Sequence, residues 1–290
     1  MRVAYLGPAG TFAEEALRAS APEGIAIEEL PYPTVYETVM AVQQGEVDRA
    51  VVPIENSLEG SVSATLDALA GEADGVRIAA EVVRPIEHCL IAREQVELGD
   101  VRRVISHPQA IAQCGGFLRE RLAEAEPATA ASTADAVRTV AGTEEPWAAI
   151  GPRLAAELYG CRVLAAGVED RSDNLTRFVW LAPAGAEPPG PAAKTSVVFW
   201  GFNDESPGAL VRVLAEFADR EINLTKIESR PRRVRLGHYM FFADLIGAAD
   251  EPRVREALEA LGRRVQTLKV LGSYPIWPGA APGQTAESII

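Results

Sequence analysis

Basic residues are scarce in this sequence: 28 lysines and arginines face 41 aspartates and glutamates, and the formal net charge at pH 7 is −13. A general nucleic-acid-binding protein replaces the counterions of phosphate with lysine and arginine, so this balance argues against that class. One short basic run, Arg230, Arg232, Arg233 and Arg235, is the exception. It is expected either to lie in a solvated loop or to contact an anion or a partner.

Cysteine and histidine are also sparse, with three of each. The scattered, odd-numbered set Cys89, Cys114 and Cys161 argues against a disulfide framework and for a reducing, cytoplasmic compartment. No histidine shares metal-ligand spacing with a cysteine, so we expect no bound metal. No stretch approaches the roughly 18 apolar residues of a membrane span. The short apolar run before the first Gly-Pro pair does not predict a signal peptide.

Proline and glycine are concentrated in one segment, APAGAEPPGPAAK, which cannot sustain a helix or a central strand. We therefore predict a linker at 183–194. It divides the chain into two parts, each long enough to bury a core of its own. The last residues, 276–290, are rich in glycine, proline and alanine and are expected to form a flexible tail.

The part before the linker alternates strand-like and helix-like segments, which predicts an α/β domain with largely parallel sheets. The strand-like segments are RVAYLG, RAVVPIE, VRRVIS and PWAAIG. The helix-like segments that follow them are TFAEEALRAS, SVSATLDALAG, PQAIAQCGGFLRERLAEA and PRLAAELYG, the last ending at Gly160. In such sheets ligands bind in the loops that leave the carboxyl ends of the strands.

The part after the linker has a different pattern. TSVVFWGF, INLTKIESR, LGHYMFFADLIG and VQTLKVLGSYP are strand-like, and PGALVRVLAEFADR and PRVREALEALG are helix-like. In the first of these helices Leu210, Val213, Leu214 and Phe217 share one face. The resulting order, βαββαβ, predicts a ferredoxin-like domain.

The first loop with candidate chemistry lies in YLGPAGTFAEEA, where Gly7 and Gly10 separate a strand from a helix. The N-terminal amides of that helix would suit a carboxylate or a phosphate. Thr11 and Glu14 also have the spacing of a capping box, which alone would explain both residues. The two roles can coexist.

The second loop, in VVPIENSLEGSV, follows a strand that is expected to be buried. It places five polar side chains and a glycine in seven positions: Glu55, Asn56, Ser57, Glu59, Gly60 and Ser61. Any one of them could serve a turn or a helix cap, but their density favours a binding site.

The third loop, in VISHPQAIAQC, carries Ser106, His107 and Gln109 as a dense set of hydrogen-bonding groups. Ser106 or His107 could instead cap the helix, and Pro108 fits its first position. Ser106 lacks the G-x-S-x-G elbow of a serine nucleophile, so no catalytic triad is predicted.

The fourth loop is DRSDNLTRF. Asp170 and Asp173 could pair with Arg171 or Arg177 as surface partners, each pair contributing about 0–1 kcal/mol. Arg177 could instead hold a substrate carboxylate through two parallel hydrogen bonds.

Taken together and in this order, GPAGTF, PIENS with Gly60, SHPQA with Cys114 and DNLTRF resemble the signature motifs of prephenate dehydratases. PGAL at 207–210 and ESRP at 228–231 resemble the phenylalanine-binding motifs of ACT regulatory domains. The resemblance covers about residues 3–275. One departure is Ala13, where the family often has serine, and no role is carried to that position.

The resemblance implies that residues 1–182 form a two-lobed catalytic domain like a type II periplasmic binding protein. One lobe would hold about 1–80 with 170–182 and the other about 83–166, with the active site in the cleft between them. Residues 195–275 would form the ACT domain. The family works as a homo-oligomer, a dimer or a tetramer, with phenylalanine bound between paired ACT domains. Because the first strand begins at once, a monofunctional enzyme without a chorismate mutase segment is expected.

The implied reaction converts prephenate to phenylpyruvate with loss of carbon dioxide and water, on the way to phenylalanine. Aromatisation drives it, so no cofactor is expected. The enzyme must orient the substrate and help the hydroxyl to leave, and general acid catalysis typically contributes 10²–10⁴-fold. The resemblance assigns this task to Thr176. A protonated Glu55, its pKa raised by burial, is the rival acid.

The remaining site residues follow from the same motifs. The other catalytic candidates are Asn56, Ser106 and Gln109. Substrate-binding candidates are Thr11, Phe12, Ser57, His107, Asn174, Arg177 and Phe178, of which Arg177 either clamps a carboxylate or anchors its loop and Phe178 mainly packs. Candidates for binding phenylalanine are Gly208, Ala209, Leu210, Asn223, Leu224, Glu228, Ser229, Arg230 and Pro231.

Two alternative functions remain open. An arogenate dehydratase would act on the amino analogue of the same substrate. A non-catalytic amino-acid sensor would combine binding lobes with an ACT domain, although Thr176 and the complete set of four loops argue against it.

Overall fold

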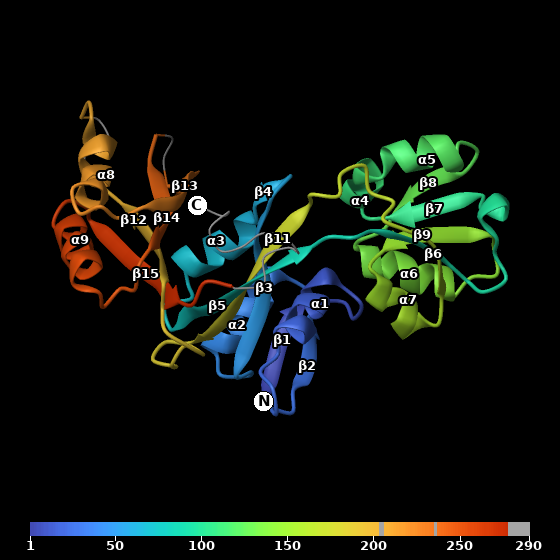
Figure 1. Ribbon diagram of the computed structural model, residues 1–290, viewed down its shortest axis with the longest axis horizontal. Coiled ribbons are helices and arrows are strands. Elements are labelled where there is room, and N and C mark those ends of the chain that lie inside the picture. The colour runs from blue at the N-terminus through green and yellow to red at the C-terminus, as the bar shows by residue number, and fades with distance from the viewer. Residues whose placement is uncertain (203–205, 235–236, 278–290) are drawn as a thin grey trace.

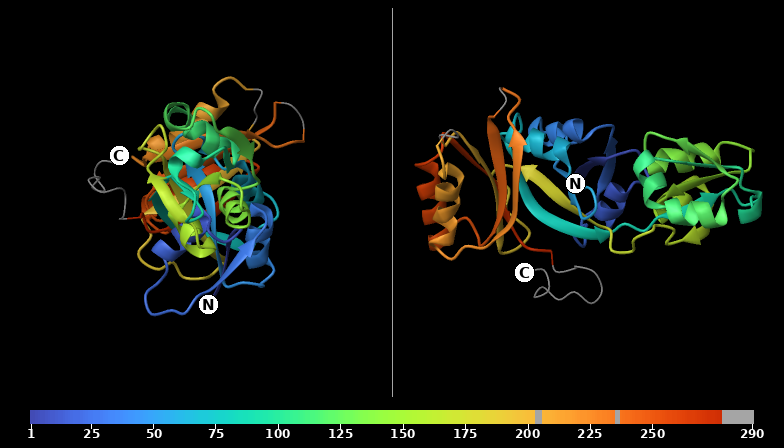
Figure 2. Two further views of the ribbon diagram at one scale, coloured as in Figure 1. Left: turned by 90° about the vertical axis from the view of Figure 1, so that its right-hand side faces the viewer. Right: turned by 90° about the horizontal axis from the view of Figure 1, so that it is seen from above.

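Three β-sheets lie in a row along the long axis of the molecule, each with its own helices (Figures 1 and 2). The structure is a computed structural model that describes residues 1–202, 206–234 and 237–277. Arg235 and nearly all of the predicted tail lie outside these residues. Within them, no helix has the length and apolar character needed to span a membrane.

The first sheet, at the centre of the row, has the order β2-β1-β3-β11-β5, with the short β4 beside β3. Its strands are β1 (Arg2–Leu6), β2 (Glu28–Tyr32), β3 (Arg49–Asn56), β4 (Gly60–Ser61), β5 (Val76–Pro85) and β11 (Leu175–Pro183). Its helices are α1 (Phe12–Ala19), α2 (Val35–Gln43) and α3 (Ser63–Ala70). The core beneath α1 and the core shared by α2 and α3 lie on opposite faces of this sheet.

The second sheet has the order β10-β6-β9-β7-β8. Its strands are β6 (Cys89–Ala92), β7 (Arg103–Ser106), β8 (Glu126–Thr129), β9 (Trp147–Gly151) and β10 (Arg162–Ala166). Its helices are α4 (Pro108–Gln113), α5 (Gly115–Arg121), α6 (Thr133–Ala141) and α7 (Arg153–Tyr159), with a short 3₁₀ turn at Leu98–Asp100. α7 ends at Gly160, whose φ of 65° is the left-handed conformation predicted there.

Two details differ from the sequence-based expectation. Both sheets are mixed rather than largely parallel. In the first sheet β11 runs antiparallel to its neighbours, and in the second sheet β6 and β10 do so. These strands flank the two crossings between the lobes. The segment PQAIAQCGGFLRERLAEA is not one helix, since it breaks at Cys114 into α4 and α5. The two glycines that follow Cys114 weaken a continuous helix at this point.

The third sheet is antiparallel, with the order β13-β14-β12-β15. It consists of β12 (Lys194–Trp200), β13 (Leu224–Pro231), β14 (Tyr239–Ile246) and β15 (Thr267–Tyr274), with the helices α8 (Ala209–Ala218) and α9 (Pro252–Gly262). Val213 and Phe217 of α8 are buried against this sheet, as the helical spacing predicts. The predicted fold class is confirmed: two α/β lobes are followed by a βαββαβ domain.

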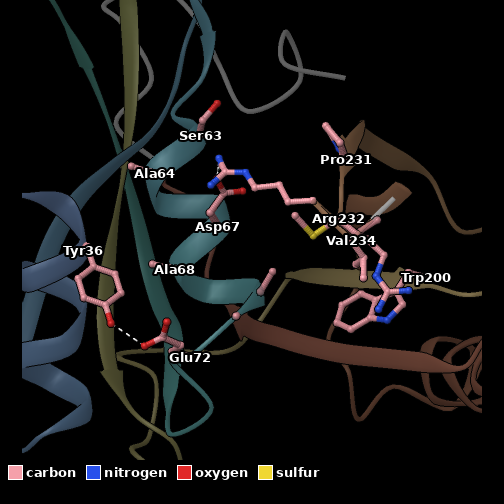
Figure 3. Close-up of a pocket in the computed structure, with 14 residues that line it drawn as sticks. Tyr36, Ser63, Ala64, Asp67, Ala68, Glu72, Trp200, Pro231, Arg232 and Val234 are labelled. Carbon is pink, nitrogen blue, oxygen red and sulfur yellow. Dashed lines mark hydrogen bonds and ion pairs between the residues drawn. The ribbon is translucent and has the colours of Figure 1, made fainter. Parts of the chain in front are cut away.

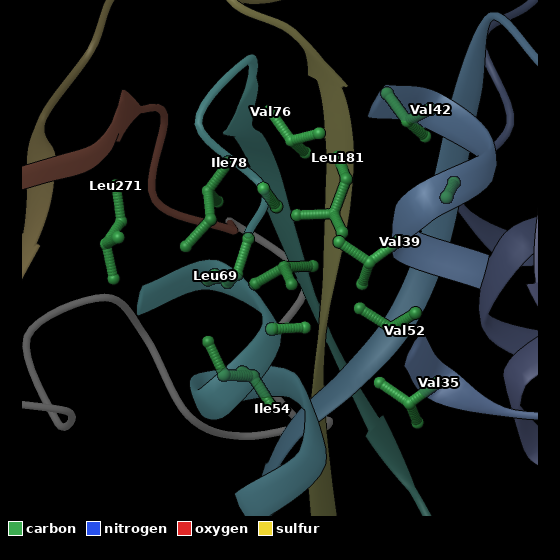
Figure 4. Close-up of a cluster of buried hydrophobic side chains, with 14 of the residues drawn as sticks. Val35, Val39, Val42, Val52, Ile54, Leu69, Val76, Ile78, Leu181 and Leu271 are labelled. Carbon is green, nitrogen blue, oxygen red and sulfur yellow. The ribbon is translucent and has the colours of Figure 1, made fainter. Parts of the chain in front are cut away.

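One hydrophobic core joins the third sheet to the first (Figure 4). Ile78 of β5, Leu69 of α3 and Leu181 of β11 belong to the same buried cluster as Leu271 of β15. At Gly272 the strands approach so closely that an added Cβ would lie 2.8 Å from the Cβ of Ile78. The third sheet is therefore packed directly on the back of the first lobe.

Candidate active site

A cavity of about 530 Å³ lies between the first and second sheets. All four candidate loops reach it, and the predicted site residues in its wall are Thr11, Phe12, Asn56, His107, Gln109, Asn174, Thr176 and Phe178. The loops are far apart in the sequence, so the pairing of β3 with β11 and the approach of the two lobes bring them together.

Asn56, Asn174 and Thr176 form a hydrogen-bonded group in the wall of this cavity. The Asn56 amide nitrogen donates to Asn174 Oδ1 over 2.7 Å and to Thr176 Oγ1 over 2.8 Å. Its oxygen accepts from the backbone N–H groups of Leu58 and Glu59, both at 3.0 Å, which fixes the orientation of the amide. Thr176 Oγ1 is thus an acceptor in this bond, and its proton remains available to a group in the cavity.

A β-bulge decides which side chain of β3 faces the cleft. Thr176 is paired with Asn56 and Arg177 with Glu55, but Phe178 is paired with Pro53, so Ile54 is an extra residue on β3. With regular alternation, Pro53 and Glu55 would share a face. The bulge instead turns Asn56 into the cleft and Glu55 to the opposite face.

The structure therefore does not place Glu55 where a rival acid would act. Its carboxylate lies 3.0 Å from the guanidinium of Arg177 and 3.5 Å from Nζ of Lys226 on β13. The extra residue in β3, which alternation along the sequence cannot reveal, accounts for the difference.

Arg177 also faces away from the cavity, because it alternates with Thr176 and Phe178 along β11. Its side chain is only 11% exposed and contacts three carboxylates: Glu55 at 3.0 Å, Glu81 at 3.3 Å and Asp244 at 2.7 Å. Burial opposes its charge, but the three carboxylates and Tyr274 raise the pKa of Arg177 well above its usual value. The structure thus does not bring Arg177 to a substrate in the cleft.

The third loop also has one candidate side chain that lies away from the cavity and two that line it. The hydroxyl of Ser106 is fully buried and donates to the carbonyl of Ile150 over 2.6 Å, so it is not in the cavity wall. His107 and Gln109 do line the cavity. His107 Nδ1 caps α4 by accepting from the backbone of Gln109 at 3.4 Å, and Pro108 occupies the first helical position as predicted.

Ser57 holds two of the loops together rather than lining the cavity. Its hydroxyl accepts from the backbone N–H of Leu175 at 2.9 Å and donates to the carbonyl of Asp173 at 3.3 Å. This contact fixes the start of β11 next to the end of β3.

The capping box predicted in the first loop does not form. The Thr11 hydroxyl donates to the carbonyl of Leu6, and the Glu14 carboxylate accepts from Gly10 N–H at 2.6 Å and from the Tyr5 hydroxyl at 3.1 Å. Glu14 therefore fixes the glycine turn, and Thr11 does not cap the first amides of α1, whose first residues Phe12 and Ala13 line the cavity.

Two cavity residues were not predicted, His88 and Gln113. With Glu59 of the second loop they form a chain of hydrogen bonds across the cleft. Gln113 Nε2 donates to Glu59 at 3.2 Å, so its oxygen is the acceptor facing His88 Nε2 at 3.1 Å. His88 must then carry its proton on Nε2. Burial lowers the pKa of His88, which favours the neutral ring. The sequence signal was available for Gln113, which lies four residues after Gln109 on the same helix face.

The described wall of the cavity contains no lysine or arginine that could bind an anion. Helices begin there instead: Phe12 opens α1 and Thr133 opens α6, after its N-cap Ser132. Helix N-termini carry partial positive charge and unpaired N–H groups, so this wall can accept carboxylates.

The predicted effector residues lie at the other end of the molecule. Gly208, with φ of 73°, precedes α8, and Glu228 and Ser229 lie on the edge strand β13. Arg230 is not free for an effector, since it donates to Asp67 at 2.8 Å and to Ser63 of α3 at 2.6 Å.

A second hollow, of about 840 Å³, lies between α3 and the third sheet (Figure 3). Tyr36 and Glu72 meet at one side of it over 2.5 Å, and Arg232 stacks on Trp200 at the other. Although it is the larger of the two, none of the predicted catalytic residues lines it. We therefore assign the chemistry to the interlobe cavity.

Comparisons with known proteins agree with this architecture. The profile of the family described as prephenate dehydratase matches residues 3–186, and that of the ACT domain matches residues 199–263. A prephenate dehydratase from Mycolicibacterium vanbaalenii is 42% identical, and the match covers 99% of this chain and 95% of that protein.

Solved structures give the same picture. A prephenate dehydratase from Arthrobacter aurescens in complex with L-Phe matches with a TM-score of 0.87 and 39% identity, covering 99% of this chain and 93% of that one. A protein described as GqqA, a novel type of quorum quenching acylase, matches with a TM-score of 0.85 and 33% identity, covering 96% and 99%. The chain belongs to the prephenate dehydratase family, a family of carbon–oxygen lyases, and carries an ACT domain after the dehydratase part.

Proposed function

We propose that the interlobe cavity converts prephenate to phenylpyruvate, carbon dioxide and water. The observation that carries this proposal is the Thr176 hydroxyl, which accepts a hydrogen bond from Asn56 at 2.8 Å and keeps its own proton for the cavity. A donor held in this way can hydrogen-bond the ring hydroxyl as it departs.

Substrate binding in this proposal relies on helix ends and on packing. The two carboxylates of prephenate are held by the N-termini of α1 and α6, and the ring packs between Phe12 and Phe178. Gln109 and His107 border the same space and supply further polar contacts. Glu55 and Arg177 take no direct part, because both side chains lie behind the strands.

Steady-state turnover of prephenate by the full-length protein tests the proposal, with Thr176→Ala and Thr176→Ser as a matched pair. We expect kcat to fall about 10²–10³-fold in the alanine variant, with little change in KM, and to recover partly with serine. If only KM rose in the alanine variant, Thr176 would bind the substrate without taking part in the transition state.

Arogenate serves as the competing substrate in the same assay. Turnover of arogenate and not of prephenate would make the protein an arogenate dehydratase. A folded wild type inactive on both would leave the non-catalytic amino-acid sensor.

We also propose that the protein is a homo-oligomer, a dimer or tetramer regulated by L-phenylalanine between paired ACT domains. The support is the relative solved with L-Phe, together with the PGAL turn at Gly208–Leu210 and the edge position of β13. Calorimetry and light scattering on the full chain test both parts. Absence of heat on adding phenylalanine would reject the regulation, and a monomer would reject the pairing.

The proposed assignment divides the chain as the motifs do, with catalytic lobes in 1–182, a linker at 183–194 and an ACT domain at 195–275. We place the enzyme in the cytoplasm, in keeping with its three unpaired cysteines.

A further inference from the structure

We propose that Asp244, a residue of the third sheet, is a positioning residue for the dehydratase reaction, acting through Arg177 on the strand that carries Thr176. This inference rests on the function proposed above. It assigns to the ACT domain a residue that helps to shape the cleft in the absence of any effector.

Two successive contacts connect Asp244 in the third sheet to the site between the lobes. Asp244 Oδ2 lies 2.7 Å from a terminal nitrogen of Arg177, the closest of the three carboxylates around that guanidinium. Arg177 directly follows Thr176, and its pairing partner Glu55 directly precedes Asn56. The paired positions Thr176 and Asn56 face the cleft, and the paired positions Arg177 and Glu55 face the third sheet. A shift of Arg177 therefore moves the two strands at the point where the Asn56–Thr176 hydrogen bond is made.

Asp244 is itself held rigidly on its own domain. Its other oxygen, Oδ1, accepts from the Ser196 hydroxyl at 2.5 Å, and Ser196 shares a hydrogen bond of 2.6 Å with the Tyr274 hydroxyl. Both neighbours are buried, Tyr274 completely. One oxygen of the Asp244 carboxylate is thus fixed by the third sheet, and the other is directed to the catalytic lobe. The carboxylate therefore has a fixed orientation toward Arg177.

The charges around Arg177 explain why Asp244 matters more than the other two carboxylates. Glu81 is shared with Lys194, whose Nζ lies 2.8 Å from it, and Glu55 is shared with Lys226 and is 37% exposed. Asp244 has only Arg177 as an ion-pair partner among the described residues. If Asp244 loses its charge, the buried guanidinium of Arg177 keeps only two carboxylates, each already shared with a lysine. Arg177 is then drawn toward Glu55 and away from its present position.

A second ion pair between the same two parts of the molecule provides the matched control. Asp67 on α3 accepts from Arg230 of β13 at 2.8 Å and from Arg233 at 2.8 Å. This pair also joins the third sheet to the first lobe, but it ends on a helix and does not reach β3 or β11. Asp67→Asn therefore weakens the domain contact without touching the strands of the site.

The experiment compares full-length wild type, Asp244→Asn and Asp67→Asn by two measurements. The first is kcat and KM for prephenate, where we expect kcat to fall about tenfold in Asp244→Asn, with KM within about twofold, and to stay near wild type in Asp67→Asn. The second is hydrogen exchange of the backbone in peptides covering residues 174–178, which should become faster in Asp244→Asn alone.

A double variant separates positioning from general destabilisation. In an Arg177→Met background, Asp244→Asn should cause little further loss of kcat, because the ion pair between Asp244 and residue 177 is already absent. Full additivity would overturn the proposal, as would equal losses in the Asp67→Asn and Asp244→Asn single variants. Should Asp244→Asn not fold, Ser196→Ala tests the same point, because it keeps the carboxylate charge and removes its fixed orientation. A smaller loss of kcat with faster exchange at 174–178 is then expected.

The exchange measurement keeps this inference separate from the proposed function. A wild type without turnover of prephenate rejects the function. Unchanged exchange at 174–178 in the variants rejects the role of Asp244, whatever the activity.

Discussion

The side-chain amide of Asn56 donates to the hydroxyl of Thr176 over 2.8 Å, and two backbone N–H groups hold that amide in the donating orientation. In Asn56→Asp this direction is reversed, because a carboxylate can only accept. The Thr176 proton would then point to position 56 instead of into the cavity. We expect kcat to fall about 10²-fold with a small change in KM, measured with prephenate at saturating and low concentrations.

Asn56→Ala provides the control for that reversal. It removes the donor without offering an acceptor, so Thr176 keeps its proton and the loss of kcat should be smaller than in Asn56→Asp. Equal losses in the two variants would mean that the direction of the hydrogen bond is not the cause.

The fold and the position of the site could largely be predicted from the sequence. Alternating strand and helix signals and the Pro/Gly segment predicted an α/β part, a linker and the βαββαβ domain, and the resemblance to prephenate dehydratases implied the two lobes. The four loops do meet at one cavity. Which side chains point inward could not be predicted as well. The structure turns Glu55, the predicted rival acid, away from the cleft because one extra residue in β3 reverses the alternation of all positions after it.

Arg177 and Ser106 show a second limit. Both residues lie inside motifs that reach the cavity, yet Arg177 is turned to the third sheet and Ser106 is buried and hydrogen-bonded to the neighbouring strand β9. The partner that captures each one, Asp244 or the carbonyl of Ile150, is distant in the sequence. Only the packing of separate elements brings these partners together, so local patterns carry no information about them.

Gly272 contacts Ile78 where the third sheet packs on the first lobe. We expect this packing to tolerate no side chain at position 272. An added Cβ would overlap the carbonyl of Ile78 and lie 2.8 Å from its Cβ. Gly272→Ala should therefore push β15 away from β5 and lower the free energy of unfolding by about 1–3 kcal/mol in urea titration. Gly99→Ala, where an added Cβ meets nothing within 4 Å, is the control. Equal stability of the two variants would show that the strands separate without cost.

A hydrogen bond between the lobes predicts an effect on substrate binding. The Tyr159 hydroxyl, on α7 of the second lobe, donates to the carbonyl of Ala9 in the first at 2.8 Å. Tyr159→Phe removes about 0.5–1.5 kcal/mol of net stabilisation from this contact, so KM for prephenate should rise roughly two- to tenfold. Tyr36→Phe removes a similar bond, to Glu72, which lies away from the cleft, and should leave KM unchanged. A KM in Tyr159→Phe equal to that of the control would contradict the prediction.

The buried His88 side chain should make the free energy of unfolding depend on pH. Burial lowers its pKa from the ordinary 6.5, and the hydrogen bond that His88 donates to Gln113 and the charge of Glu169 only partly oppose this effect. Between the lowered value and 6.5 the unfolded chain binds a proton that the folded protein does not. The free energy of unfolding should therefore decrease as the pH falls below 6.5, by up to about 1.4 kcal/mol per pH unit from this residue.

Denaturant unfolding of wild type and His88→Gln at several pH values between about 5 and 8 measures this contribution. The glutamine can still donate toward Gln113 but does not titrate, so the wild type should lose stability relative to the variant as the pH falls. Tyr159→Phe, which changes no group that titrates in this range, should follow the wild type in parallel. If the curve of His88→Gln also stayed parallel to the wild type, the acid sensitivity of the fold would have to come from another residue.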